Sequence, residues 1–213
     1  MIPRRYERLK QVLSKRQTDL TVVTEDVHKP HNFSAIIRTC DAVGIFEVHA
    51  VNSNSDMPAY STVAKGSEKW VHLHTHPDLP TAIAKLKQRQ IKVYAAHLSD
   101  RAVDYRDLDY TQPTAILMGS EKKGVSELAS NLVDGHIIIP MMGMVESLNV
   151  SVAAAVILFE AQRQRLAAGM YEQASLDPQA FEKVIFEWGY PVIAASCRKQ
   201  GKPYPPLKED GSI

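Results

Sequence analysis

The feature that most constrains this chain is an alternation of short apolar stretches with longer helical ones. Strands are expected at 20–23, 46–51, 70–74, 91–98, 114–118 and 137–139. Helices are expected between them at 32–43, 81–90 and 126–132, and a further helix follows Ser147. Such alternation is typical of α/β proteins with a mostly parallel sheet that helices cover on both faces.

Three loops that follow apolar strands are candidate ligand loops, because ligands of parallel sheets bind beyond the carboxyl ends of strands. They are 96–100, 119–125 and 140–147. The third loop begins at Pro140 and leads to Ser147, a plausible N-cap for an apolar helix that reaches Phe159. This helix has few polar residues and is expected to be buried on most sides.

The composition indicates an ordinary globular protein with basic residues at one end. The chain has 213 residues, 45% of them hydrophobic and 23% charged, which suits one α/β domain with terminal extensions. Its formal net charge of +1 does not mark a nucleic-acid binder. However, six basic residues and one acid, Glu7, lie in the first sixteen positions. The helix expected at 3–17 is therefore either a solvated surface helix or one held against phosphates.

Several classes of protein are disfavoured by what the sequence lacks. The two cysteines, Cys40 and Cys197, show no zinc or disulfide spacing, and no metal site is expected. The period-2 histidines within 72–76 have no carboxylate or cysteine close in sequence. No signal peptide, membrane-spanning run or G-x-G-x-x-G fingerprint is found, so a soluble cytoplasmic protein is expected.

The remaining segments divide the chain into three expected parts. These are a basic helical extension at 1–19, a central domain at 20–168, and a helical extension with a tail at 169–213. Pro178 is expected to open a helix that Gly189 ends. The Pro-rich tail after the basic segment 198–202 is expected to be mobile. Residues 52–58 are expected to form a loop and 60–66 a short helix or turn.

Three stretches of the central domain resemble a known family. Residues 31–39, 116–125 and 138–153 are similar, in order and spacing, to the three motifs of the SpoU branch of the SPOUT superfamily. Those proteins are 2′-O-ribose methyltransferases that act on RNA with S-adenosylmethionine. The resemblance covers residues from about 20 to 165. The flanks, including 29–32 and 189–191, resemble the bacterial tRNA (guanosine-18-2′-O)-methyltransferases, which methylate a guanosine ribose in the D-loop of tRNA.

This resemblance implies a homodimer that binds tRNA, and a deep trefoil knot at about 96–150. It implies that S-adenosylmethionine is held by 96–100, 117–121 and 139–149. The contacts implied for the cofactor are Ala96, Leu98, Gly119, Ile139, Met141 and Leu148. Ala96 stands where relatives can carry a hydroxyl residue, so a side-chain hydrogen bond would be missing there. The residues implied to contact tRNA are Arg8, Arg16, His31, Arg163 and Arg165.

The resemblance also assigns catalytic roles. Arg38 resembles the arginine that activates the ribose hydroxyl, and Asn32 the residue that positions the ribose. Glu121, Ser147 and Asn149 match further functional positions of the second and third motifs. Asn32 is also a plausible N-cap, and Arg38, six residues later, is expected to point to a roughly similar side. An exposed, salt-bridging Arg38 is the alternative without function.

The identity of the base is left open by the residues. Arginine is a poor general base because its pKa exceeds about 12. Arg38 is therefore expected to bind the adjacent phosphate and stabilise a developing alkoxide, with Glu121 as the alternative base. Other possible functions are methylation of another tRNA position or of rRNA, or RNA binding without catalysis. The five intact motif residues disfavour the last, and the short segment before the first strand disfavours an rRNA enzyme with a separate RNA-binding domain.

Overall fold

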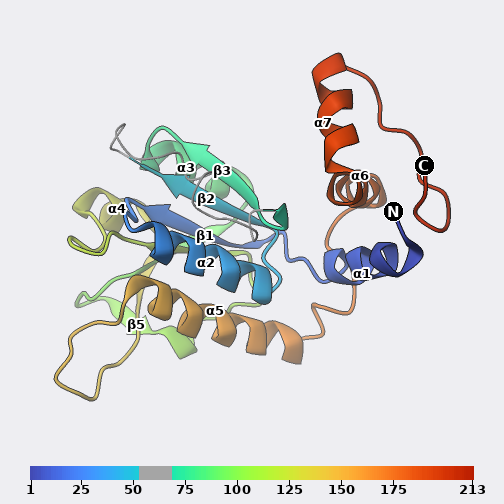
Figure 1. Ribbon diagram of the computed structural model, residues 1–213. Helices are drawn as coiled ribbons and strands as arrows, with labels where there is room; N and C mark the ends of the chain where they lie inside the picture. Colours follow the sequence, from blue (N-terminus) through green and yellow to red (C-terminus); the bar gives the residue numbers. More distant parts are fainter. Residues whose placement is uncertain (53–68) are drawn as a thin grey trace. The chain divides into compact units, whose positions relative to one another are not determined.

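The computed structural model describes residues 1–52 and 69–213, and it forms two compact units. One unit is Thr18–Met170, and the other combines Met1–Gln17 with Tyr171–Ile213 (Figure 1). The turn expected at 60–66 lies outside the described residues, as does most of the loop 52–58. The two ends of the chain, which the sequence suggested were separate extensions, thus contribute to one unit.

The Thr18–Met170 unit is built on one parallel sheet. Seven strands occur in its described part, in the order β3-β2-β1-β6-β4-β7-β5, and every pairing between them is parallel. The strands are β1 (Leu20–Glu25), β2 (Glu47–Val51), β3 (His72–His76), β4 (Lys92–Ala96), β5 (Ala102–Asp104), β6 (Thr114–Met118) and β7 (Gly135–Ile138). The predicted parallel sheet is confirmed. Strand β5 was not predicted, because three residues are too few to show a period-2 pattern.

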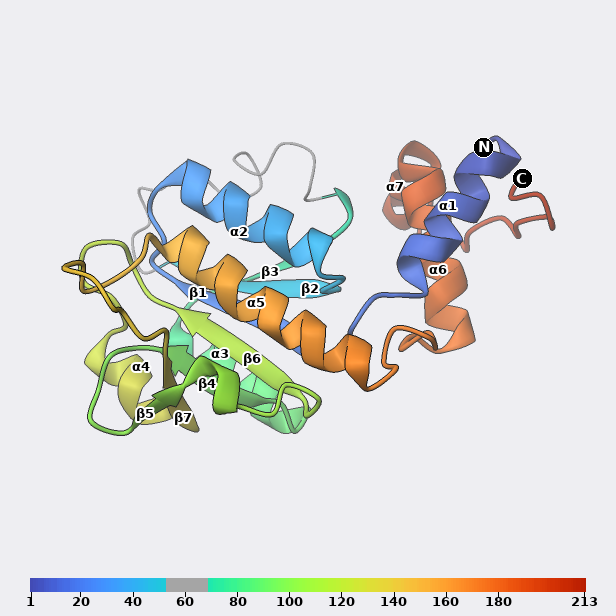
Figure 2. The ribbon, with the colours of Figure 1, turned by 90° about the horizontal axis from the view of Figure 1, so that it is seen from below.

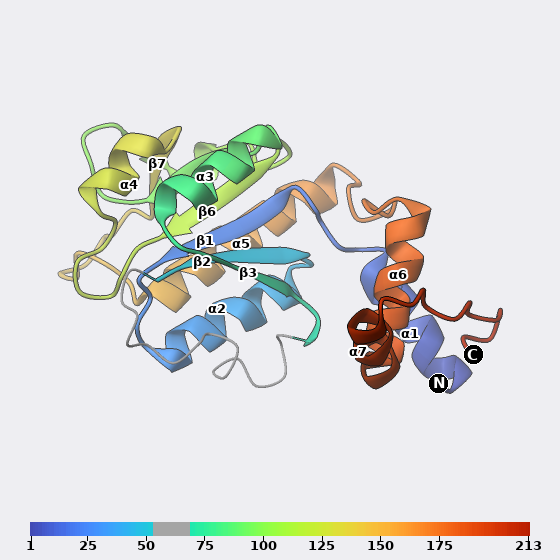
Figure 3. The ribbon, with the colours of Figure 1, turned by 90° about the horizontal axis from the view of Figure 1, so that it is seen from above.

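Helices cover both faces of this sheet, as predicted. On one face α2 (Pro30–Ala42) lies beside α5 (Val150–Ala167), and both contribute to the larger apolar core (Figure 2). On the other face, α3 (Leu79–Gln88) and α4 (Glu127–Leu132) pack against the second core (Figure 3). A single 3-10 turn, η3 (Tyr105–Asp107), follows β5. The Thr18–Met170 unit therefore has three layers, helix–sheet–helix, and the candidate ligand loops follow the ends of its strands.

Three predicted helix starts are wrong, among them that of α3, which begins at Leu79 rather than at 81. Helix α2 begins at Pro30, because the fixed φ of proline suits a first helical turn, so Asn32 lies inside that turn and is not the N-cap. Helix α5 begins at Val150, and its N-cap is Asn149 rather than Ser147. The Asn149 Oδ1 accepts a hydrogen bond from the Ser151 N–H at 2.9 Å, which satisfies one of the free donors of that helix end.

The predicted burial of α5 is also wrong. Val152, Phe159 and Leu166 are 48%, 50% and 57% exposed. Residues seven positions apart are almost two turns apart and lie on one side of a helix. The helix therefore buries one side against α2 and the sheet and presents a line of apolar side chains on another. Polarity along the sequence did not reveal this, because the exposed line is as apolar as the buried one.

The second unit is helical. It contains α1 (Pro3–Leu13), which packs on α6 (Pro178–Gly189), and α7 (Pro191–Gln200), which was not predicted. The tail that was expected to be mobile packs against α6, where the Tyr204 ring stacks on Phe186 with 4.7 Å between ring centroids. The Tyr190 hydroxyl donates to the Gly211 carbonyl at 2.9 Å and accepts from the N-terminal amine at 2.5 Å. No helix among the described residues has the length and apolar character needed to cross a membrane.

Candidate active site

A cavity of about 540 Å³ opens at the carboxyl ends of three neighbouring strands. These strands are β6, β4 and β7, which are adjacent in the sheet. The cavity is lined by residues from 96–98, 118–124 and 137–150. The three loops that the sequence singled out thus meet at one place, as the rule for ligands of parallel sheets predicts.

All six residues that the family resemblance assigned to the cofactor line this cavity. They are Ala96, Leu98, Gly119, Ile139, Met141 and Leu148. Gly119 is required by a close backbone approach, because a Cβ there would lie 2.3 Å from the carbonyl carbon of Gly124. The turn is closed by two hydrogen bonds of 2.9 Å between the backbones of Ser120 and Gly124. This turn brings the backbone of Gly119 to the cavity wall.

A hydrogen-bonded chain of side chains joins the three motifs at the cavity. Asn32 donates from Nδ2 to Oε1 of Glu121 at 2.9 Å, and its Oδ1 accepts from Nδ2 of Asn149 at 3.2 Å. Glu121 and Asn149 line the cavity, and Asn32 is buried between them. Residues separated by 89 and 117 positions are thereby held in one geometry. We call this chain of Glu121, Asn32 and Asn149 the rim network.

Glu121 accepts hydrogen bonds from three donors. Besides Asn32, its carboxylate accepts from the backbone N–H groups of Lys29 at 3.0 Å and His28 at 3.1 Å. Burial raises the pKa of Glu121, but the hydrogen bonds from Asn32 and these backbone groups outweigh it, and the pKa is lowered. A carboxylate with a lowered pKa and three donors is a weak base. The structure therefore favours a positioning role for Glu121 over the role of base.

Arg38 lies apart from the rim network. Its side chain is exposed and does not line the cavity, whereas Asn32 is buried. Six residues turn an α-helix through about 600°, which leaves the two side chains roughly 120° apart. The expectation that Arg38 and Asn32 point to similar sides is therefore wrong. Ser147 is exposed on the cavity wall.

Comparison with known protein families identifies the family of this chain. The model of the SpoU rRNA methylase family matches residues 19–159, and the model of its C-terminal region matches residues 163–213. The chain belongs to the SpoU rRNA methylase family. It is 53% identical over its whole length to the tRNA (guanosine(18)-2′-O)-methyltransferase of Escherichia coli K12, covering 94% of that protein.

Two solved structures extend this comparison of the SpoU chain. The TrmH/SpoU tRNA modifying enzyme of Aquifex aeolicus superposes with a TM-score of 0.81 and 41% identity, over 88% of this chain and 96% of that one. The SpoU methyltransferase AviRb of Streptomyces viridochromogenes, solved with the cofactor AdoMet, superposes with a TM-score of 0.64 and 29% identity. That match covers 72% of this chain and 64% of AviRb.

The arginines expected to contact tRNA separate into buried and exposed groups in this SpoU chain. Arg16 is 1% exposed, with its guanidinium 5.5 Å from the ring centroid of Trp188. Arg165 is fully buried, donates to the Tyr110 carbonyl at 2.8 Å and pairs with Asp19 at 2.5 Å. Both guanidinium groups are occupied by these partners in the structure, and the expectation that they contact tRNA stays a prediction. Sequence shows an arginine's charge but not the ring or carbonyls that bury it.

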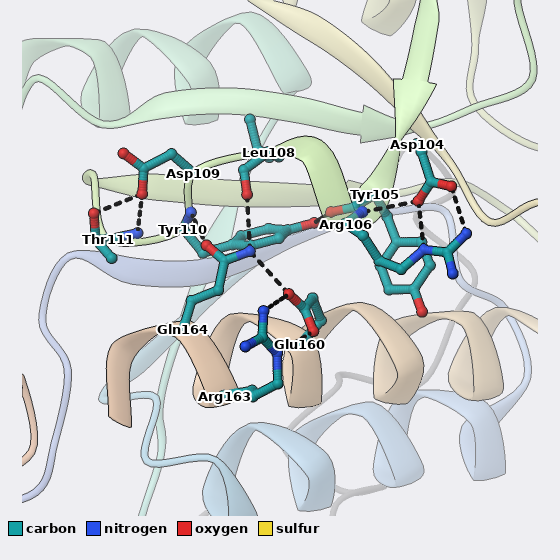
Figure 4. A network of polar contacts seen from close by, with 10 residues as sticks. All are labelled: Asp104, Tyr105, Arg106, Leu108, Asp109, Tyr110, Thr111, Glu160, Arg163 and Gln164. Carbon is teal, nitrogen blue, oxygen red and sulfur yellow. Dashed lines mark hydrogen bonds and ion pairs between the residues drawn. The ribbon is translucent and has the colours of Figure 1, made fainter. Parts of the chain in front are cut away.

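The other three expected RNA contacts remain accessible in the SpoU chain. Arg8 and His31 are exposed, and Arg163 is exposed while pairing with Glu160 at 2.7 Å (Figure 4). Lys29 and Glu146 also line the cavity, although the sequence did not single them out. Both stand within three residues of predicted site residues, Asn32 and Ser147, and this proximity was the available signal.

The histidines of β3 form polar pairs within the sheet. The His74 Nε2 lies 3.0 Å from the Glu47 carboxylate, and the His76 Nε2 lies 2.9 Å from the His49 Nδ1. The carboxylate that was missing in sequence is thus near in space, on β2. Across the part of the SpoU chain that the structure describes, no group of three or more His, Cys, Asp or Glu side chains is arranged to hold a metal ion.

Proposed function

We propose that the chain transfers a methyl group from S-adenosylmethionine to the ribose 2′-hydroxyl of guanosine 18 in the D-loop of tRNA. The observation that carries this proposal is the rim network on the wall of the cavity. It joins the three motif regions in a chain that is 53% identical, over its whole length, to an enzyme named for that reaction.

The cavity fits S-adenosylmethionine. Its volume of about 540 Å³ lies within the range of roughly 300–1,000 Å³ typical of small-molecule sites. Apolar side chains of Leu98, Ile139 and Leu148 line it, which suits a flat base, and Gly119 contributes to the cavity wall. The six residues already assigned to the cofactor would hold it. When bound, it supplies an electrophilic methyl group.

The chain's own residues would position and activate the ribose. Glu121 and Asn149 fix the Asn32 amide, which leaves little rotamer freedom to lose when the ribose binds. Arg38 is exposed and would bind the phosphate next to the reacting ribose and stabilise the developing alkoxide. The hydroxyl proton would pass to that phosphate or to water. Ser147, at the cavity wall, would contact the substrate.

We also propose that two copies associate through α5. The exposed line of Val152, Phe159 and Leu166 is the kind of apolar surface that a partner covers. A Phe159→Glu variant should then be monomeric in size-exclusion chromatography with light scattering, whereas Arg163→Glu, on the same helix but already paired with an acid, serves as the control. Dimers of unchanged stability in Phe159→Glu would place the interface elsewhere.

A trefoil knot at about 96–150 is part of this proposal. It is supported by the position of β7, which lies between β4 and β5 although the chain makes it after both. Residues 97–101, which join β4 to β5, therefore have to cross β7. We further propose a cytoplasmic location, where tRNA is modified, and tRNA contacts through Arg8, His31 and Arg163.

The test is methyl incorporation from labelled S-adenosylmethionine into an unmodified tRNA transcript, followed by mapping of the labelled nucleotide. Label at G18 is expected. A matched transcript with 2′-deoxyguanosine at position 18 has no hydroxyl to methylate and should stay unlabelled. Label in rRNA or at another tRNA position would keep the chemistry but change the substrate. Intact tRNA binding without any label would leave a non-catalytic binder.

A further inference from the structure

The connection from β4 to β5 is held across β7. Ala96 pairs with Ile137 on one side of β7, and Ala102 pairs with His136 on the other. The intervening residues, 97–101, are called the β4–β5 loop here. This loop contributes His97 and Leu98 to the cavity wall, and Leu98 is largely exposed. An exposed loop with cavity residues needs an anchor if it is to present them in one conformation.

Backbone hydrogen bonds hold this loop from His97 to Ile137 at 3.1 Å and from Ala102 to Ser99 at 3.0 Å. Its side-chain anchor is the imidazole of His136, which is 2% exposed. Its Nδ1 lies 2.6 Å from Oγ of Ser99, at the middle of the β4–β5 loop. Its Nε2 lies 3.1 Å from the guanidinium of Arg101 and 3.2 Å from the carbonyl oxygen of Ser130, in α4. The ring of His97 packs edge-on against it, with centroids 5.2 Å apart. One buried ring thus joins the loop, β7 and α4.

A neutral imidazole keeps its hydrogen bond with Ser99 in either tautomer, whereas only the tautomer with the proton on Nδ1 can also accept from Arg101. With the proton on Nε2, it donates to the Ser130 carbonyl and accepts from the Ser99 hydroxyl. With the proton on Nδ1, it donates to Ser99 and accepts from Arg101. Helix α4 directly follows the second cavity loop, 119–125. The contacts of His136 therefore fix two cavity loops with respect to each other.

We propose that His136 is a positioning residue for the cofactor. By holding the β4–β5 loop through Ser99, it keeps that wall of the cavity in the conformation that binds S-adenosylmethionine. The inference rests on the proposed function, because it assigns the cofactor to this cavity. Loss of the anchor lowers cofactor affinity, since binding then has to order the loop. The chemical step at saturating cofactor is little affected, because the bound cofactor restores the order.

Ser99→Ala is the first test, with S-adenosylmethionine binding measured by titration calorimetry. The dissociation constant is expected to rise about tenfold, the usual effect of one lost hydrogen bond, while kcat at saturating cofactor changes less than about twofold. Ser99→Thr keeps the hydroxyl and should restore wild-type affinity. Thr111→Val is a matched control. It removes a hydrogen bond of 2.6 Å from the Thr111 hydroxyl to Asp109, and neither residue lines the cavity.

His136→Asn is the second test, alone and combined with Ser99→Ala. The double variant should bind cofactor no more weakly than His136→Asn, because His136→Asn already breaks the contact that Ser99→Ala removes. Wild-type affinity in Ser99→Ala, or an affinity loss equal in Ser99→Ala and Ser99→Thr, would overturn the inference. If the wild-type chain itself fails to bind S-adenosylmethionine, it is the proposed function that fails.

Discussion

Two polar networks in the Thr18–Met170 unit use similar side chains to different ends. The rim network connects Glu121, Asn32 and Asn149 and lies at the cavity. The second network, shown in Figure 4, joins the segment 104–111 to α5. There Gln164 accepts from the Tyr110 N–H at 2.9 Å and donates to the Leu108 carbonyl at 3.0 Å. We call it the α5 network.

The difference lies in what each network leaves available. In the α5 network each arginine is neutralised by a nearby acid, Arg106 by Asp104 and Arg163 by Glu160. Hydrogen bonds from Arg163, together with Gln164, lower the pKa of Glu160. The residues of the α5 network bond to one another, and none of them lines the cavity. The rim network instead joins distant parts of the chain at a wall where a ligand can reach it. A network of satisfied hydrogen bonds therefore does not by itself indicate function. The position of the rim network at the carboxyl ends of the strands does.

The largest expected effect is on catalysis through Arg38. Arg38→Ala should lower kcat for methylation at least 10²–10³-fold, about the cost of losing one group that stabilises transition-state charge. Cofactor affinity should not change, because Arg38 does not line the cavity. Single-turnover kinetics and calorimetry measure the two quantities, with Arg106→Ala as the matched exposed arginine. Normal turnover in Arg38→Ala would remove Arg38 from the mechanism.

The next largest effect is on stability through Arg165. Arg165→Met should lower the free energy of unfolding by about 3–5 kcal/mol, because it leaves Asp19 and buried carbonyl oxygens without their donor. Arg163→Met, two residues earlier and exposed, should leave it nearly unchanged. Urea denaturation of both variants measures the difference. Equal losses would show that burial of Arg165 is not what makes it matter.

One variant in each network tests the difference between the two networks. Gln164→Leu should lower the free energy of unfolding by about 1–2 kcal/mol, because the Tyr110 N–H and the Leu108 carbonyl lose their partner, and leave kcat unchanged. Asn32→Ala should lower kcat far more than its effect on stability accounts for. Both are measured by denaturation and by methylation at saturating substrates. A large loss of kcat in Gln164→Leu would contradict the division between the networks.

The smallest expected effect concerns acid stability at Glu121. Its pKa is lowered in the folded chain, so the ionised carboxylate stabilises the fold above its unfolded pKa of about 4.3. That contribution is lost as the pH falls through the lower, folded value. The difference in unfolding free energy between wild type and Glu121→Gln should therefore shrink on acidification from pH 7 to pH 3. A constant difference would mean that the charge of Glu121 does not matter.

The parallel sheet, its helical covers and the meeting of three loops could be predicted, because periodic apolar segments encode them directly. The starts of α2 and α5 could not, since Asn32 and Ser147 are good caps in isolation, whereas the observed N-caps are Lys29 and Asn149. The motif residues came from resemblance to a family, because sequence spacing does not show which side chains will meet. His136 gave no signal, since its partners lie in three separate segments.

The most direct test of the central claim is a crystal structure with S-adenosylhomocysteine, the product form of the cofactor. This ligand is expected to lie between 96–98, 118–124 and 137–150, beside the rim network. Substitution of residues that line the cavity should then weaken the electron density of the bound ligand. The ligand bound elsewhere, such as in the hollow beside His74 and Arg89 at the edge of the sheet, would contradict the assignment of the active site.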